Sequence, residues 1–290
     1  FSFKNNSAHG GTLQKAIYER VIFRQPFAKE RGRSGPMSGY DPYIDRTKNY
    51  ITYLEQQGRG IREFECPGSI EEIRKDMPVE FRAGANPGII LKSKTFAELG
   101  NPQAGSSSFI LWTENPSLLQ DGKITLIGPD IPESEGASLT FGQVLIMGGE
   151  DLYPDLQEKM EDCQHLGDQL EGYMERTTTD SIWGRISTDA AAKGFSMETL
   201  GKALMLSMKS AIEEVESMEI LFVTSGKDDI MPLKEIAKDT LSIRDDLIRE
   251  FWKSKGYELT CNLDCSACEF RDGCNGIKQM LLERWKMEQR

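Results

Sequence analysis

Short apolar segments in the middle of the chain predict β-strands. Residues 109–115, 123–131 and 143–149 are rich in Ile, Leu, Val and aromatic side chains, and Gly, Pro and Asp bound them. Residues 219–226 form a further apolar run between two helical patterns. Strands mixed with helices predict an α/β fold, with a layered mixed sheet and packed helices.

Apolar residues at helical spacing predict three longer helices in the second half of the chain. They cover residues 155–176, 197–215 and 229–252, and Ser196 is the expected N-cap of the second. In the first helix the apolar positions are Leu156, Met160, Cys163, Leu166, Leu170 and Met174.

The N-terminal region, residues 1–75, mixes Gly, Pro and charged residues without a clear period and is expected to be irregular. Within it, helices are predicted at 12–24 and at 46–57. A short helix at 69–76 is expected to begin with a capping box, S-x-x-E.

Two of the predicted strands end in turns that are candidate ligand-binding loops. G-P-D follows one strand at 128–130 and G-G-E-D follows another at 148–151, and ligand loops often lie at such strand ends. A Gly-Pro-Asp turn also needs no ligand to explain it. Both interpretations of G-P-D are open at this point.

The formal net charge of −11 over 290 residues argues against a nucleic-acid partner, which needs a basic face. No apolar run reaches the ~18–20 residues that span a bilayer, and the first residues lack the apolar core of a signal peptide. We therefore expect no membrane association and a cytoplasmic location. The chain has two histidines, His9 and His165, which excludes mechanisms built on several histidines.

Four of the six cysteines fall within residues 261–274, in the pattern C-x3-C-x2-C-x5-C. Thiols stay reduced in the cytoplasm, so disulfides are not expected there. Thiolates bind soft metals, which leaves zinc or an iron–sulfur cluster. The predicted ligands are Cys261, Cys265, Cys268 and Cys274.

The spacing of these cysteines favours a [4Fe–4S] cluster over zinc. Zinc usually takes two short cysteine pairs separated by a longer span, whereas one winding loop can wrap an iron–sulfur cube. Gly273 and Gly276 are expected to supply tight turns for that loop. Zinc is kept as the alternative metal. If Cys261 is a spectator, the cluster has three cysteine ligands and one iron with an open coordination position.

Two longer motifs resemble acetyl-CoA synthase, the beta subunit of the CO dehydrogenase/acetyl-CoA synthase complex. They are DGKITLIGPDI at 121–131 and IWGRISTDAAAKGF at 182–195, and the similarity runs in order over about residues 76–270. Further matches are DMPVEF at 76–81, AELG at 97–100, IRDD at 243–246 and YELTCNLDCSAC at 257–268.

The resemblance implies three parts. Residues 1–75 have no recognised counterpart. Residues 76–255 are similar to the family's central α/β domain, which is associated with coenzyme A. Residues 256–290 hold the C-terminal four-cysteine loop and a final helix at 276–288.

Trp183, Arg185 and Lys193 match the family's W-x-R and A-K-G-F motifs, and the resemblance implies that they bind coenzyme A. Each has an ordinary structural alternative. For Trp183 the alternative is core packing, and for Arg185 and Lys193 it is an ordinary surface or capping role.

The resemblance also implies a function in anaerobic one-carbon metabolism. The family joins a methyl group from a corrinoid iron–sulfur protein, CO from a dehydrogenase, and coenzyme A, so a corrinoid protein or a CO dehydrogenase-type subunit is the expected partner. The family holds its distal nickel with C-x-C, which this sequence lacks, so nickel is not expected. The alternatives are a docking or electron-transfer module for a corrinoid protein and a zinc-stapled scaffold.

Overall fold

A computed structural model of the chain describes residues 21–23, 38–66, 69–85, 88–150, 152, 154–178, 181–263 and 268–288. The chain divides into two compact units. The larger unit is residues 34–243, and the smaller unit combines residues 1–33 with residues 244–290. Helix α7 contributes residues to both.

A five-stranded mixed sheet forms the centre of the larger unit. Its order is β2-β5-β10-β7-β4, with β5 parallel to β10, β7 parallel to β4, and the other neighbours antiparallel. The predicted layered mixed sheet is therefore confirmed. The strands are β2 (Ile61–Glu65), β4 (Ser106–Thr113), β5 (Lys123–Ile127), β7 (Phe141–Gly148) and β10 (Ser217–Val223).

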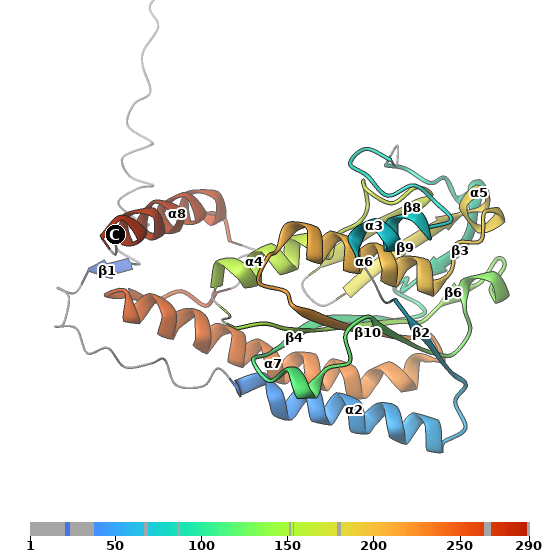
Figure 1. The fold of residues 1–290 in the computed structure, drawn as a ribbon, viewed down its shortest axis with the longest axis horizontal. Helices are drawn as coiled ribbons and strands as arrows, with labels where there is room; N and C mark the ends of the chain where they lie inside the picture. Colours follow the sequence, from blue (N-terminus) through green and yellow to red (C-terminus); the bar gives the residue numbers. More distant parts are fainter. Residues whose placement is uncertain are drawn as a thin grey trace, which may run out of the picture. The chain divides into compact units, whose positions relative to one another are not determined.

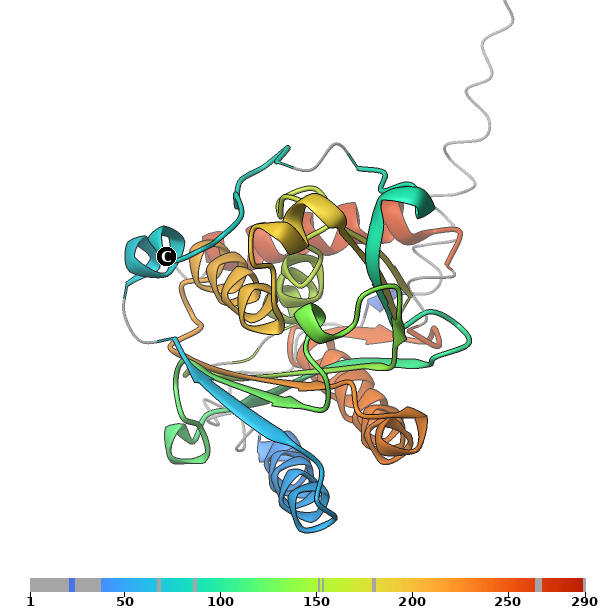
Figure 2. The same cartoon turned by 90° about the vertical axis from the view of Figure 1, so that its right-hand side faces the viewer.

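Helices cover both faces of this sheet (Figures 1 and 2). The first part of α7 (Lys227–Ser254) lies with α2 (Asp41–Gln56) on one face, and α4 (Pro154–Cys163) lies with α6 (Met197–Ala211) on the other. Gly201 lets α6 pack closely on β5, because a Cβ there would lie 2.7 Å from Cδ1 of Ile124. Ile124 itself is fully buried, so burial of apolar surface holds the layers together.

A second sheet of four strands has the order β6-β3-β9-β8. Ser106 of β4 connects it to the large sheet, because its hydroxyl donates to the Ile182 carbonyl at 2.8 Å and accepts from the Ile182 N–H at 2.9 Å. The strands are β3 (Thr95–Leu99), β6 (Ser138–Leu139), β8 (Tyr173–Thr178) and β9 (Ser181–Ser187).

Short helices complete the larger unit. The capping box predicted at Ser69 and Glu72 is present at the start of α3 (Ile70–Lys75), and Ser196 caps α6 as predicted. The remaining elements are α5 (Thr188–Ala192) and the 3-10 turns η1 (Ser38–Tyr40), η2 (Lys92–Lys94), η3 (Pro116–Leu118) and η4 (Ile131–Glu133).

The smaller unit has its own apolar core. Strand β1 (Val21–Phe23) pairs antiparallel with β11 (Tyr257–Leu259), and α8 (Arg271–Glu288) follows the cysteine segment. The buried residues of this core are Trp252, Leu259, Leu263 and Leu281.

Two helix predictions are wrong in part. The helix expected at 155–176 stops early, since α4 ends at Cys163 and β8 begins at Tyr173. Gly172 has φ 71°, which interrupts a helix, and the apolar residues beyond α4 are buried from a loop and a strand instead. The helix expected at 12–24 is a strand at 21–23, and its other residues lie outside the described part of the chain.

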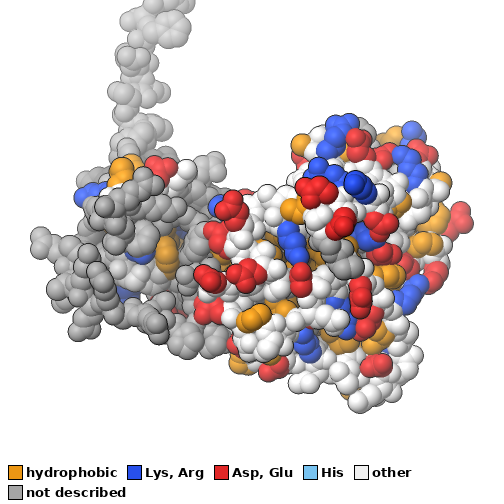
Figure 3. Space-filling model, in the orientation of Figure 1, with side chains coloured by type: hydrophobic (Ala, Val, Ile, Leu, Met, Phe, Trp, Pro, Cys, Tyr) orange, Lys and Arg blue, Asp and Glu red, His pale blue; other side chains and the backbone are white. Residues whose placement is uncertain are grey.

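None of the helices described by the structure is long and apolar enough to cross a bilayer. On the face drawn in Figure 3, Lys and Arg side chains are interspersed with Asp and Glu over the larger unit and do not gather into a basic stripe.

Candidate functional site

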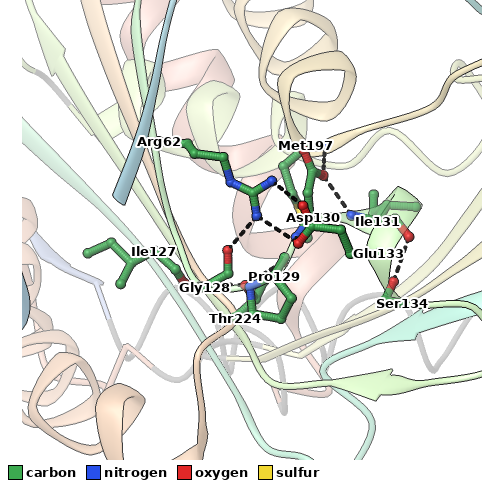
Figure 4. A network of polar contacts seen from close by, with 10 residues as sticks. All are labelled: Arg62, Ile127, Gly128, Pro129, Asp130, Ile131, Glu133, Ser134, Met197 and Thr224. Carbon is green, nitrogen blue, oxygen red and sulfur yellow. Dashed lines mark hydrogen bonds and ion pairs between the residues drawn. The ribbon is translucent and has the colours of Figure 1, made fainter. Parts of the chain in front are cut away.

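The Gly-Pro-Asp turn after β5 has a structural role (Figure 4). The buried Asp130 carboxylate accepts from the backbone N–H of Ile131 at 2.6 Å and from that of Met197 at 2.8 Å. The second bond caps the first turn of α6, where N–H groups have no partner within the helix. Asp130 therefore ties β5 to α6.

Other side chains hold the backbone of this turn. Arg62 donates to the carbonyl oxygen of Gly128 at 2.8 Å and forms an ion pair with Glu133 at 2.6 Å (Figure 4). Thr224 donates to the carbonyl oxygen of Pro129 at 2.7 Å. These contacts account for the motif without a ligand, in agreement with the second sequence interpretation.

Asp130→Ala is expected to lower the free energy of unfolding by about 2–3 kcal/mol, because it leaves two buried N–H groups without acceptors. Asp130→Asn keeps one acceptor oxygen and is expected to cost less. Urea unfolding followed by circular dichroism measures both. Asp228→Ala, at an exposed first-turn position of α7, is the control and should change stability by less than about 0.5 kcal/mol.

A second candidate site lies on the outer face of the four-stranded sheet. Side chains alternate along β9, so Ile182 and Ile186 are buried while Trp183 and Arg185 lie half-buried on the other face. Arg176 of β8 pairs in register with Trp183, and Glu98 of β3 pairs with Arg185. We call these four residues the Trp183 face.

Trp183 lies close to two guanidinium groups. The guanidinium carbon of Arg185 is 4.7 Å from the centre of the indole ring, and that of Arg176 is 5.7 Å away. Cations at these distances are attracted to an aromatic ring. The indole Nε1 is buried and has no hydrogen-bond acceptor among the residues that the structure describes. Trp183 is thus partly exposed and in a cationic setting, which differs from simple core packing.

Arg185 is held in place by Glu98. Its Nε lies 2.8 Å from the Glu98 carboxylate, and a second nitrogen donates to the Ile90 carbonyl at 3.2 Å. Burial raises the pKa of Glu98, but hydrogen bonds from Arg185 and Asn101 outweigh it and leave that pKa below its ordinary value. An anionic ligand would therefore compete with Glu98 for Arg185, whereas Arg176 is exposed.

Lys193 follows α5 and forms an ion pair with Glu171. The hydrogen bond from Lys193 is the main cause of the lowered pKa of Glu171. The structure thus brings Trp183 and Arg185 into contact and gives Lys193 a different partner, as expected for an ordinary surface role.

Sequence analysis missed two residues of the Trp183 face. Arg176 falls at the end of the incorrect helix at 155–176, and that helix does not predict its position opposite Trp183. Glu98 was part of the A-E-L-G match without a role. Side chains alternate between the two faces of a strand. Trp183 and Arg185 are two residues apart, and this spacing is the signal that would have placed these two residues on one face.

The described part of the cysteine segment lies in the smaller unit. Cys261 packs against the core of that unit, and its carbonyl oxygen accepts from Arg249 at 3.1 Å. Cys268 precedes α8, and Cys274 lies within that helix. Cys265 lies outside the described residues. Where the structure describes side chains, no three His, Cys, Asp or Glu residues are grouped closely enough to hold a metal ion.

Two features of the segment bear on the predicted cluster. Leu263 is buried at φ 58°, a conformation that a leucine adopts only when its surroundings enforce it. The donor chemistry fits a soft metal, because four thiols lie within fourteen residues. Gly273 and Gly276 lie inside α8, so the prediction that they form tight turns is wrong.

The model of one protein family, described as the CO dehydrogenase/acetyl-CoA synthase complex beta subunit, matches residues 77–229, just over half of the chain. Two similar proteins are acetyl-CoA decarbonylase/synthase complex beta 1 subunits. The one from Methanosarcina thermophila is 30% identical over 158 residues, which are 54% of this chain and 33% of the relative. The one from Methanosarcina mazei is 32% identical over the same shares.

A further relative matches a longer part of the chain. The carbon monoxide dehydrogenase/acetyl-CoA synthase subunit alpha of Moorella thermoacetica is 26% identical over 204 residues, which are 69% of this chain and 26% of the relative. The chain thus spans about a third or less of the length of these curated relatives. The matched segment contains every strand of the two sheets except β2, together with the Trp183 face. The chain belongs to the family of the CO dehydrogenase/acetyl-CoA synthase complex beta subunit.

Proposed function

We propose that the chain is an acetyl-CoA-synthase-like iron–sulfur protein of anaerobic one-carbon metabolism, whose larger unit binds coenzyme A at the Trp183 face. The observation that carries the proposal is the family match over residues 77–229, which includes Trp183, Arg185 and Arg176. The relatives are named as subunits of a complex, so a CO dehydrogenase-type subunit or a corrinoid protein is the proposed partner.

The chemistry of the Trp183 face suits a nucleotide with phosphate groups. An indole provides a flat apolar surface for a base, and guanidinium groups donate pairs of hydrogen bonds to phosphate. In this proposal Arg176 binds a phosphate group of the ligand first. Arg185 then breaks its ion pair with Glu98 and binds a phosphate oxygen.

The cysteine segment would hold the metal. Cys265, Cys268 and Cys274 are the proposed ligands of a [4Fe–4S] cluster, with Cys261 as the fourth ligand or as a spectator. When bound, such a cluster transfers single electrons. The sequence has no C-x-C pair for nickel, so the proposal includes no dinickel site. Zinc held by the same thiols is the structural alternative.

Coenzyme A titration followed by tryptophan fluorescence tests ligand binding by the larger unit. Trp112 and Trp252 are buried and Trp285 belongs to the smaller unit, so we expect Trp183 to provide most of the change and Trp183→Phe to remove it. Arg185→Gln and Arg176→Gln should each weaken binding about tenfold, which is the loss of one charged hydrogen bond. Glu98→Gln should strengthen it, because Arg185 loses its competing partner.

Arg46→Gln is the matched control, since Arg46 forms an exposed ion pair with Asp239. It should leave binding unchanged. If wild-type protein does not bind coenzyme A, or Glu98→Gln weakens binding as Arg185→Gln does, the coenzyme A assignment is wrong. The Glu98–Arg185 ion pair would then favour the alternative function, a docking or electron-transfer module for a corrinoid protein.

A further inference from the structure

Three polar side chains lie behind the Trp183 face, on the buried side of the four-stranded sheet. Glu175 of β8 pairs in register with Gly184, the residue between Trp183 and Arg185. The Glu175 side chain is only 6% exposed. A Cβ on Gly184 would lie 2.8 Å from the Tyr173 ring, so the glycine is needed for this close packing. His165, in the turn between α4 and β8, faces Glu175 with its buried Nδ1 atom, although 39% of its side chain is exposed.

Two buried atoms of this group face each other without a hydrogen bond. His165 Nδ1 and Glu175 Oε1 are 3.8 Å apart, beyond the 2.7–3.2 Å that is usual for a hydrogen bond. Both atoms are buried, and neither has a hydrogen-bond partner within the described part of the chain. The Glu175 carboxylate does accept from the Tyr173 hydroxyl and from the backbone N–H groups of Leu166 and Gly167. Native proteins rarely leave two such atoms unsatisfied.

The surroundings favour the uncharged form of both groups. Burial raises the pKa of Glu175 to about 7, and the nearby Asp168 adds to this, while the hydrogen bonds from Leu166, Tyr173 and Gly167 oppose it. Burial lowers the pKa of His165, and Asp162 opposes that change. A protonated carboxyl is a donor and a neutral imidazole is an acceptor, so the uncharged forms of the two groups are complementary in hydrogen bonding.

We propose that Glu175 and His165 form a buried site for one proton, held between Oε1 and Nδ1, and that loss of this proton opens the segment from residue 163 to residue 175 behind β9. The titratable groups that act on the pair are Tyr173 from β8, Asp162 from the last turn of α4, and Asp168 from the turn that carries His165. The site is a proton-controlled switch in the fold, independent of any ligand on the Trp183 face.

The direction of the pH effect follows from Glu175. Its folded pKa is raised, so the stability that its proton provides is fully present below an ordinary carboxyl pKa and is lost as the pH rises through about 7. The lowered pKa of His165 acts in the opposite sense, because its contribution is lost as the pH falls. Because the two groups face each other, the titration of each depends on the protonation state of the other.

NMR of the two histidines tests the proposal in the intact chain. The His165→Asn variant identifies the His165 signals, because the signals that remain belong to His9. In wild-type protein we expect the His165 signals to show an inflection near pH 7 that reports the titration of Glu175. Glu175→Gln should remove that inflection. Tyr173→Phe should move it to higher pH, because the carboxylate loses a hydrogen bond.

Hydrogen exchange measures the opening itself. Between pH 6 and pH 8 the protection of the Leu166 and Gly167 amides, corrected for intrinsic exchange rates, should fall at least tenfold in wild-type protein and remain constant in Glu175→Gln. The proposal is overturned if Glu175→Gln changes neither the His165 inflection nor the amide protection. A Tyr173→Phe inflection that moves to lower pH would also overturn it.

Discussion

Gly149→Ala is expected to destabilise the larger unit by about 3 kcal/mol or more. Gly149 follows β7, and a Cβ there would overlap the carbonyl oxygen of Glu214 and lie 2.8 Å from the ring of Trp112. Trp112 is fully buried and backbone carbonyls cannot be displaced cheaply, so neither neighbour can make room. Urea unfolding monitored by circular dichroism gives the change in free energy.

Gly60→Ala is the matched control. No atom lies within 4 Å of the position that its Cβ would occupy, and its φ is not in the positive range. This variant should be neutral or raise the free energy of unfolding by up to about 1 kcal/mol. If Gly149→Ala were as well tolerated as Gly60→Ala, the G-G-E-D segment would need an explanation other than close packing.

Cys268→Ser and Cys274→Ser are expected to remove most of the bound iron and sulfide from anaerobically prepared protein. A serine hydroxyl is a poor ligand for a soft metal, and a cluster with three remaining thiolates is easily lost. Iron and sulfide analysis measures the loss directly. Cys261→Ser separates the two roles proposed for Cys261, because a spectator can be replaced without loss of iron.

Cys163→Ser is the control for the cysteine series. Cys163 ends α4 in the larger unit, far along the sequence from the other cysteines, and burial raises the pKa of its thiol. This substitution should leave the iron and sulfide content unchanged. Equal metal loss in Cys163→Ser and Cys268→Ser would mean that the cysteine segment is not the ligand set.

The layered sheet and the helical faces were predictable because apolar runs and helical periodicity report burial directly. The same dependence on burial explains the main error. Residues beyond α4 are buried at roughly helical spacing, although Gly172 at φ 71° ends any helix before β8. Because β8 is not predicted from the sequence, the position of Arg176 opposite Trp183 is not predicted either.

The candidate site was predicted as a motif but not as a set of contacts. The W-x-R pattern identified Trp183 and Arg185, yet the ion pair between Arg185 and Glu98 joins strands 87 residues apart in sequence. A single sequence does not show which residues of such distant strands lie opposite each other, so this pairing is known only from the structure. The His165–Glu175 pair is not predicted either, because the incorrect helix at 155–176 contains both residues.

We propose that this family member carries an iron–sulfur cluster on the cysteines of residues 261–274. Iron, sulfide, zinc and nickel analysis of wild-type protein purified without oxygen, together with its visible spectrum, tests this most directly. The account predicts about four irons and four sulfides per chain, a brown protein and no nickel. Stoichiometric zinc without sulfide, in a colourless protein, would contradict it and leave a zinc-stapled scaffold.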